Sequence, residues 1–400
     1  MAEDSERRCK RWNRILAVGV QDWKERDPGS FQKQLKKGVP DKLRWAVWKS
    51  ALQVEAHRSL GLYRELVLRG NKFTPLITID IPRTFPDMPD FGDEDQGKLL
   101  RVLDAYASME PDVGYCQGMN FIAGMLLLAS EGKEEETFWA FVSLMDKESG
   151  RLSGFFRQGF PLLSLYLRVL DKLVAKELPK LHNHFIEENV FPAVYLHQWF
   201  FGLFVNCLPM PMVLRLWDVL ICEGLEHILP ITVALLQVLE ETLLGMSFED
   251  IVRFFKSMRC SASACDSASI SRVVLAKSSD IGLSEHLLEA LRVDIDDLKL
   301  PMETEDEHHP SFLMSNKLQV KRGGDAAEEN QSTSLLFRGL SGLHDGMWTI
   351  FGTAREWRLQ GMQTNPVAAA IQAAPDEVLS GGGGATINEV RCQMNMLDVV

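Results

Sequence analysis

The residues with the clearest chemical potential are one arginine and one glutamine, Arg83 and Gln117. Arg83 lies near the end of the segment 77–84, and Gln117 lies in the glycine-containing segment 114–120. A guanidinium is planar, permanently charged and forked, so it can bridge phosphate oxygens. A primary amide both donates and accepts hydrogen bonds, so it can hold a water molecule and a phosphate oxygen together. Such a pair could complete a phosphate site that another protein carries.

The neighbours of both side chains suit this chemistry. Asp80 lies three residues before Arg83, close enough to orient the guanidinium, and Pro82 stiffens the approach. Gln117 precedes the apolar run 121–128, which predicts a helix N-terminus where free N–H groups favour phosphate. A plainer interpretation stays open at this point. Arg83 would then be a surface ion pair with Asp80, and Gln117 a helix cap or a solvated side chain.

The elements that must position these residues are helices. Apolar residues recur at helical spacing between residues 31 and 260, with short breaks. The helix expected from Pro161 shows the complete i, i+3, i+4, i+7 series, and the helix expected from Pro211 is placed to end at Gly224. Alternating runs joined by hairpin turns are nearly absent. The sequence therefore predicts an all-α fold.

One segment departs from the helical pattern. Residues Leu76–Ile81 form the one stretch that we expect to be extended. Pro82 disfavours a helical conformation at Ile81, so Arg83 is expected to follow a loop.

Composition divides the chain into four parts. Residues 1–30 are expected to be a partly helical N-terminal extension, and 31–260 a single large helical domain. Residues 261–300 are expected to combine a linker, rich in Ser and Ala up to residue 269, with a short helix. Residues 301–400 turn polar and glycine-rich, which predicts a largely disordered, mostly irregular tail.

One piece of the tail is expected to be helical, near residues 346–360. Its apolar residues share one helical face: Met347, Ile350, Phe351, Ala354 and Trp357. Two interpretations stay open for this piece. It either docks on a partner or a membrane surface, or packs on the folded domain.

Composition also limits the classes of partner and compartment. Acidic residues outnumber basic ones by 55 to 43, for a net charge of −12, which argues against nucleic acid as the main partner. No apolar run reaches the roughly 18 residues of a membrane span. The seven cysteines are scattered and odd in number, which favours reduced thiols in the cytosol. The polar, mixed-charge N-terminus predicts no signal peptide.

Two other candidate sites are weak. Gly92–Lys98 matches part of a phosphate-binding loop, but Leu99 replaces the Ser or Thr that binds Mg²⁺, and three carboxylates inside it would repel phosphate. Cys116 could be proposed as a thiol nucleophile, yet activation needs a base that the sequence does not place. We expect an acidic surface loop in the first case and a small buried packing residue in the second.

Three segments, in order, resemble the TBC-domain family of Rab GTPase-activating proteins. Residues 44–48 resemble the family motif R-x-x-x-W, and residues 77–83 resemble I-x-x-D-x-x-R, which Thr84 continues. Residues 115–117 resemble Y-x-Q, extended here through Asn120. The pairs Phe191-Pro192 and Trp199-Phe200 and the segment 214–218 look like the C-terminal half of that domain. The similarity covers about residues 35–260.

The resemblance implies a helical domain of two sub-lobes that binds a Rab-type GTPase in its GTP-bound form and accelerates GTP hydrolysis. Arg83 would be the arginine finger, and Gln117 the glutamine finger that substitutes for the GTPase's own Gln. The supporting residues that it implies are Asp80, Arg44, Thr84, Tyr115, Trp48 and Asn120. Asp80 and Arg44 would fix the finger loop, whereas Tyr115 and Trp48 would be packing residues.

The resemblance also implies how this activity would be supplied. GTP and Mg²⁺ would be carried by the partner, so we expect no cofactor and no independent active site in this chain. We expect a cytoplasmic protein at the periphery of endomembranes, recruited through the Rab and aided by the helix near 346–360. A non-catalytic Rab-binding scaffold or adaptor is the alternative, and substituting Arg83 separates the two.

Overall fold

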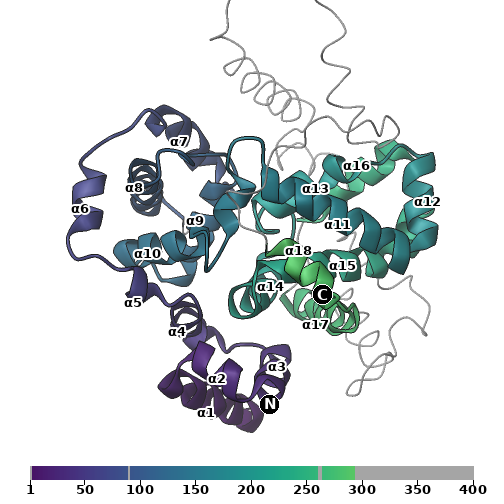
Figure 1. Cartoon of the computed structure of the whole chain (residues 1–400), viewed down its shortest axis with the longest axis horizontal. Coiled ribbons are helices and arrows are strands. Elements are labelled where there is room, and N and C mark those ends of the chain that lie inside the picture. The colour runs from purple at the N-terminus through teal and green to yellow at the C-terminus, as the bar shows by residue number, and fades with distance from the viewer. Residues whose placement is uncertain (1, 89–90, 260–263, 293–400) are drawn as a thin grey trace, which may run out of the picture. The chain divides into compact units, whose positions relative to one another are not determined.

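The computed structural model describes residues 2–88, 91–259 and 264–292, and every regular element within them is a helix (Figure 1). The predicted all-α fold is therefore confirmed. The expected tail, 301–400, and its expected helix near 346–360 lie outside the described residues. None of the described helices combines the length and the apolar character that a membrane crossing requires.

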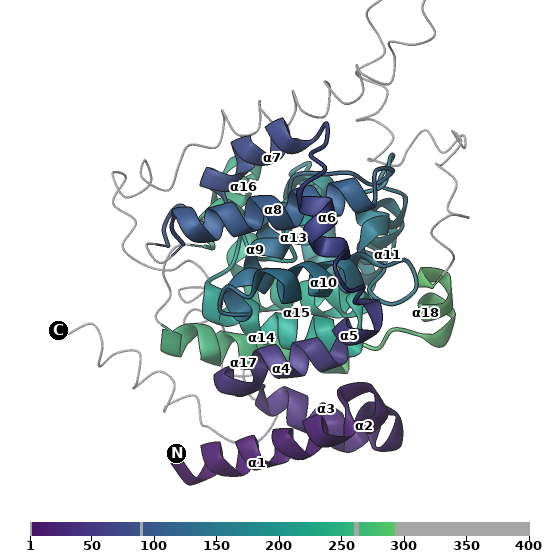
Figure 2. The same cartoon turned by 90° about the vertical axis from the view of Figure 1, so that its left-hand side faces the viewer.

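The first half of the chain carries both segments of the candidate site. Its elements are α1 (Ala2–Val18), α2 (Val20–Arg26), α3 (Pro28–Lys37), α4 (Asp41–Ala51), α5 (Val54–His57), α6 (Leu62–Val67), α7 (Thr74–Asp80), the 3₁₀ turn η1 (Ile81–Arg83), α8 (Asp93–Met109), α9 (Met119–Ala129) and α10 (Glu134–Met145). In both views α7, α8 and α9 lie in one group (Figures 1 and 2).

The second half packs against the first at several places, among them α14 (Met210–Glu223) on α4 and α17 (Ala264–Asp280) on α3. Its elements are η2 (Leu152–Phe155), α11 (Pro161–Glu177), α12 (Pro179–Glu187), α13 (Pro192–Phe201), α14 (Met210–Glu223), η3 (Leu225–His227), α15 (Ile228–Leu243), α16 (Phe248–Ser257), α17 (Ala264–Asp280) and α18 (Glu285–Leu291). The helices expected from Pro161 and Pro211 correspond to α11 and α14. Gly224 ends α14 as expected, with φ 124°, a conformation that favours glycine.

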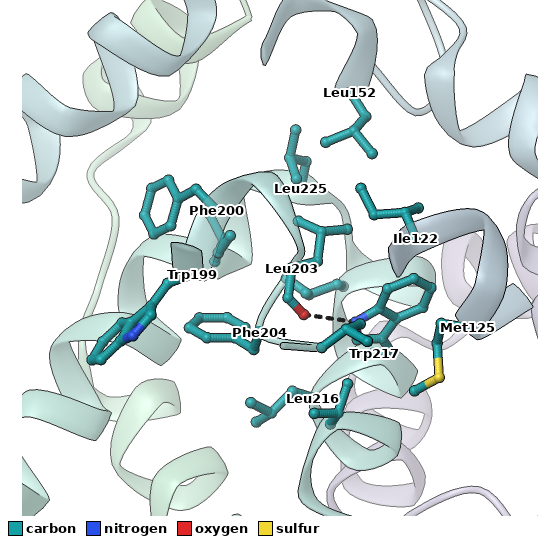
Figure 3. Packing of buried hydrophobic residues seen from close by; sticks show 14 of the residues in the cluster. Ile122, Met125, Leu152, Trp199, Phe200, Leu203, Phe204, Leu216, Trp217 and Leu225 are labelled. Atoms are coloured by element: carbon teal, nitrogen blue, oxygen red, sulfur yellow. Dashed lines mark hydrogen bonds between the residues drawn. The ribbon is translucent and has the colours of Figure 1, made fainter. Parts of the chain in front are cut away.

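The core holds the start of α9 in place. Every residue of α9 from Met119 to Leu127 is buried. Ile122 and Met125 belong to the same buried cluster as Trp217 of α14, whose indole N–H donates to the Leu203 carbonyl at 2.8 Å (Figure 3). A helix buried on all sides is fixed at its ends as well. The turn that precedes α9, which carries Gln117, therefore begins from a rigid base.

The extended stretch expected at Leu76–Ile81 was wrong. These residues form most of α7 and the beginning of η1, and Ile81 has helical angles, φ −54° and ψ −53°, although Pro82 follows it. Pro75 lies in the first turn of α7, where a missing N–H costs nothing. Full burial of Ile77 on one face of the helix outweighs the local preference of its β-branched residues. Arg83 therefore ends a continuous helical segment and does not follow a loop.

The linker expected up to residue 269 was also wrong where the structure describes it. Residues from Ala264 onward form α17, which packs on α14 and α15. Ser267 and Ser271 are fully buried, and such small residues allow helices to approach closely. The short helix expected after it is α18, which Ser284 caps by accepting a hydrogen bond from the Leu287 N–H.

The expected N-terminal extension is helical and packs on the rest of the fold. Trp12 is fully buried, its ring lies edge-on to Phe31 at 6.0 Å, and its indole N–H donates to the Gly38 carbonyl at 3.2 Å. Residues 6–30 are thus continuous with the core of the helices that follow them.

Candidate functional site

Arg83 is an exposed cation held at two points. Its Nη2 lies 2.9 Å from the Oδ1 of Asp80, and its Nε donates to the backbone carbonyl of Ile79 at 3.2 Å. The Arg83 side chain remains 45% exposed, whereas that of Asp80 is 9% exposed. The guanidinium is therefore oriented by a buried carboxylate and still presents an open edge to solvent.

The second segment of the site, residues 114–120, also binds the Asp80 carboxylate. The hydroxyl of Tyr115 donates to the Oδ2 of Asp80 at 2.7 Å, and Tyr115 is buried. Burial, and then the charge of Asp80, raise the pKa of Tyr115 well above its ordinary value, so its hydroxyl keeps the proton that it donates. Asp80 thus links Arg83 to Tyr115, which lies two positions before Gln117.

A second bridge joins the two segments on the other side of Arg83. Thr84 is fully buried, and its Oγ1 donates to the Asp80 carbonyl at 2.9 Å while accepting from the Nδ2 of Asn120 at 3.0 Å. The Oδ1 of Asn120 accepts from the N–H of Gly118 at 3.0 Å. Buried polar networks with satisfied partners are rigid. Arg83 and Gln117 are therefore each flanked by residues that tie one segment to the other.

Gln117 lies in the turn that leads into α9 and is partly buried. Gly118 follows it with φ 110°, and a Cβ there would meet the Phe201 carbonyl at 2.7 Å, so only glycine fits. The helix begins at Met119, which confirms the expected position of Gln117 at a helix N-terminus. The helix dipole at this place favours an anionic oxygen, whereas the N–H groups of Gly118 and Met119 already donate to Asn120 and to the Cys116 carbonyl.

Arg44 corrects one expectation, because it does not fix the Arg83 segment. It is buried between α4 and α14, with its Nε 3.1 Å from the Oδ1 of Asp218 and its Nη2 donating to the Val39 carbonyl at 3.0 Å. Its Nη1 pairs with Asp41. The pair Arg44–Asp218 therefore joins two helices that are far apart in the sequence.

Trp48 belongs to the same junction. It is fully buried as expected, its Nε1 donates to the Oδ1 of Asp218 at 2.9 Å, and its ring lies 5.6 Å from that of Trp217. Burial raises the pKa of Asp218, against the opposing effects of Arg44 and Trp48. Burial alone would lower the pKa of Arg44, but Asp218 and then Asp41 more than offset it and the pKa is raised.

Asp218 is the residue that sequence reasoning missed. It was included in the segment 214–218 but given no role, although it lies in the apolar stretch 216–221 of α14. A carboxylate at such a place needs a buried partner, which is the signal that could have identified it. Its partners Arg44 and Trp48 were both recognised, without their common acceptor.

The two weak candidates remain weak in the structure. Residues 93–98 are the first turns of α8, and Lys98 pairs with Glu94 at 2.8 Å, so this segment is a helix surface and not a phosphate loop. Burial and the charge of Asp80 raise the pKa of the Cys116 thiol to about 12, which keeps it protonated near neutral pH. Among the residues that the structure describes, no three His, Cys, Asp or Glu side chains are grouped so as to hold a metal ion.

Comparisons with known proteins converge on one domain. The family model RabGAP-TBC, described as a Rab-GTPase-TBC domain, matches residues 41–244. The chain is 31% identical over 247 residues to the Caenorhabditis elegans protein named Rab GTPase-activating protein eat-17, an alignment that covers 61% of this chain and 27% of that protein. It is 32% identical over 263 residues to Growth hormone-regulated TBC protein 1 of Xenopus laevis, covering 63% of this chain and 75% of that protein. The chain thus spans about a quarter of the first relative's length.

Solved structures lead to the same fold. The Chlamydomonas flagellar RabGAP TBC domain is 26% identical with a TM-score of 0.57, and the match covers 70% of this chain and 96% of that domain. The Ypt/Rab-GAP domain of Gyp1p matches with a TM-score of 0.58 at 20% identity, over 69% of this chain and 98% of that domain, which bears on the fold alone.

Proposed function

We propose, since this chain belongs to the RabGAP-TBC family, that it accelerates GTP hydrolysis by a GTP-bound, Rab-type small GTPase and supplies Arg83 and Gln117 in trans. Two deficits limit hydrolysis on a small GTPase: charge on the phosphates is incompletely neutralised, and the attacking water is poorly oriented. One exposed guanidinium and one amide address these deficits separately.

Arg83 would neutralise the developing charge. Its guanidinium is permanently charged, and its exposed edge can bridge two phosphate oxygens of a partner's nucleotide. Asp80 holds the other edge, which reduces the rotamer freedom that must be lost when the side chain docks. An arginine supplied in trans is worth about 10³ to 10⁵ in rate for such GTPases.

Gln117 would orient the attacking water. Its amide can donate to a phosphate oxygen and accept from the water at the same time, which neither a lysine nor a glutamate can do. In this role it would replace the partner's own glutamine. The buried helix behind it anchors the turn that carries Gln117.

The observation that carries this proposal is the pair of bridges between the two segments. Tyr115 to Asp80 and Asn120 to Thr84 join residues on both sides of Gln117 to residues on both sides of Arg83. Catalytic groups must be held to within a fraction of an ångström, and two independent, buried hydrogen bonds achieve this. GTP and Mg²⁺ would come with the partner. The GTPase would also bring this chain to the surface of an endomembrane.

Single-turnover GTP hydrolysis on a panel of GTP-loaded Rab proteins tests the proposal. We expect one or more Rabs to respond to the wild-type chain at micromolar concentration. Arg83→Ala should reduce the acceleration by about 10³-fold or more, and Gln117→Ala should also reduce it severely, while both variants still bind the GTPase.

Two control variants sharpen this test. Arg253 of α16 forms the same kind of pair three residues after an aspartate, with its Nη1 2.9 Å from Asp250, and Arg253→Ala should leave the rate unchanged. Arg83→Lys keeps the charge but loses the fork, and it should recover only a small part of the activity. If the GTPase hydrolyses GTP as fast with Arg83→Ala and with Gln117→Ala as with the wild type, while binding persists, the chain is a non-catalytic Rab-binding scaffold.

A further inference from the structure

The outer face of α7 is apolar and exposed. Leu76 is 52% exposed and Ile79 is 58% exposed, and the exposed prolines Pro75 and Pro82 lie before and after them. These four residues, here called the α7 strip, form a continuous row along the helix that ends at Arg83. Both views place α7 at the outer edge of its group of helices (Figures 1 and 2).

Such a surface is unusual for a helix that faces solvent, where charged and polar side chains normally predominate. The only charged residue of α7 is Asp80, and it is buried. The α7 strip therefore has no charges to desolvate. Burial of apolar surface stabilises a complex in proportion to the area removed from water, so the half-exposed side chains of Leu76 and Ile79 can each contribute to binding.

The α7 strip is continuous with the candidate site. The Nε of Arg83 donates directly to the carbonyl of Ile79, which places the guanidinium against the last turn of the strip. Ile79 and Leu76 precede Arg83 by four and seven residues, the spacing of one helix face. At about 1.5 Å of rise per residue they lie roughly 6 and 10 Å behind it along the helix axis.

A partner whose nucleotide site receives Arg83 also covers the surface within this distance of Arg83. A specific interface buries about 800 Å² on each partner, which corresponds to a patch about 30 Å across. A GTPase whose nucleotide receives Arg83 therefore lies over Ile79 and reaches Leu76. The α7 strip is also firmly supported from beneath, because Ile77 is fully buried and α7 packs on α8.

We propose that the α7 strip is a docking surface for the GTPase, and that it packs against an apolar patch beside the partner's nucleotide. This inference rests on the proposed function, since the same GTPase occupies both surfaces. The α7 strip would contribute affinity for the GTPase. It would also select among GTPases, because a polar patch at the facing position would be buried without a partner.

The test separates binding from chemistry. Leu76→Asp places an unpaired charge on the strip and Ile79→Asn places an uncharged polar group next to Arg83, and each should raise the KM for the responsive GTP-loaded Rab by about 10-fold or more. The kcat should stay near the wild-type value at a saturating GTPase concentration. Arg83→Ala should show the opposite pattern, with a reduced kcat and little change in affinity.

The chain supplies matched controls for these variants. Leu60 is 96% exposed and Leu68 is 86% exposed, and both lie outside α7. Leu60→Asp and Leu68→Asp should leave both KM and kcat unchanged. Thermal unfolding of all four variants should match the wild type, because each side chain is largely in solvent.

The outcomes distinguish this inference from the function on which it rests. An unchanged KM for Ile79→Asn and Leu76→Asp, with Arg83→Ala inactive, would overturn the docking surface and leave the proposed function intact. A fully active Arg83→Ala would overturn the proposed function. In that case the Kd of each strip variant for a Rab loaded with a non-hydrolysable GTP analogue decides the matter, and an unchanged Kd would also overturn the docking surface.

Discussion

Two arginine–aspartate pairs in this chain are built alike and differ in exposure. The Arg83–Asp80 distance is 2.9 Å and the Arg44–Asp218 distance is 3.1 Å, and both carboxylates are buried. The side chain of Arg83 is 45% exposed, but that of Arg44 is 8% exposed.

The resemblance extends to the aromatic partner of each carboxylate. Asp80 accepts from the hydroxyl of Tyr115, and Asp218 accepts from the indole of Trp48. Arg44 uses Nε, Nη1 and Nη2 on partners within the chain, whereas Arg83 bonds through Nε and Nη2 and keeps an exposed edge. An arginine whose three nitrogens all bond within the chain joins helices, whereas one that keeps an exposed edge can contact a partner. Exposure therefore separates the two roles where chemistry does not.

The largest effect expected from this comparison is on the rate of stimulated GTP hydrolysis. Arg83→Ala should lower the GTPase-stimulating activity by about 10³- to 10⁵-fold, because the guanidinium supplies charge that nothing else replaces. The free energy of unfolding should fall by only about 1 kcal/mol, because Arg83 is about half exposed and the buried Asp80 keeps the hydrogen bond from Tyr115. Stopped-flow detection of released phosphate gives the rate, and denaturant titration gives the stability.

A variant of the other pair provides the control for this experiment. The folded fraction of Arg44→Met should stimulate hydrolysis at the wild-type rate, since Arg44 lies between α4 and α14. A large loss of rate in folded Arg44→Met would break the distinction between the two pairs.

The second largest effect is on stability. Arg44→Met should lower the free energy of unfolding by about 3 to 5 kcal/mol, because Asp218 is left buried without its counter-charge. Equilibrium unfolding by urea, followed by circular dichroism, measures this loss. The cost comes from the stranded carboxylate more than from the lost contact.

A double variant tests that cause. Arg44→Met combined with Asp218→Asn removes the stranded charge while keeping an oxygen to accept from Trp48. It should be more stable than Arg44→Met alone. A double variant that is no more stable than Arg44→Met would show that the stranded charge is not the main cause of the loss.

The fold was predictable wherever a helix is amphipathic. The expected helices from Pro161 and Pro211 are α11 and α14, because apolar side chains at helical spacing must face the core. α7 was missed because the burial of Ile77, a tertiary effect, overrides local β preference. The beginning of α17 was missed because its buried face includes serines, which read as a linker in a sequence.

The site was predictable as a set of residues and not as a set of contacts. Tyr115 and Asp80 were recognised, but they are 35 positions apart and spacing cannot show that they bond. Arg44 was expected to fix the finger loop, because its carboxylate partner, Asp218, lies 174 positions away in the sequence. The sequence motifs identify which residues are present, whereas tertiary packing determines which of them are in contact.

The third effect concerns the anchor of Arg83. Tyr115→Phe should lower the free energy of unfolding by about 1.5 to 3 kcal/mol, because it deletes a hydrogen bond to a buried carboxylate. Tyr115→Phe should also lower the rate of stimulated GTP hydrolysis, since Asp80 then holds Arg83 less firmly. Tyr106 of α8 is equally buried, and Tyr106→Phe should cost less stability and leave the rate unchanged. Equal effects of the two substitutions on the rate would contradict the anchoring role of Tyr115.

The smallest effect is a pH dependence of stability, which reports whether solvent reaches the Cys116 thiol. The pKa of Cys116 is raised to about 12, above the ordinary value of about 8.5 that a thiol has in the unfolded chain. The unfolded chain therefore loses this proton first, so the thiol's contribution to stability is complete below that ordinary pKa and is lost as pH rises. Between about pH 8.5 and 9.5 the wild type should lose about 1 kcal/mol more than Cys116→Ala. Urea unfolding at the two pH values measures it, and equal losses would mean that water reaches the thiol beside Asp80.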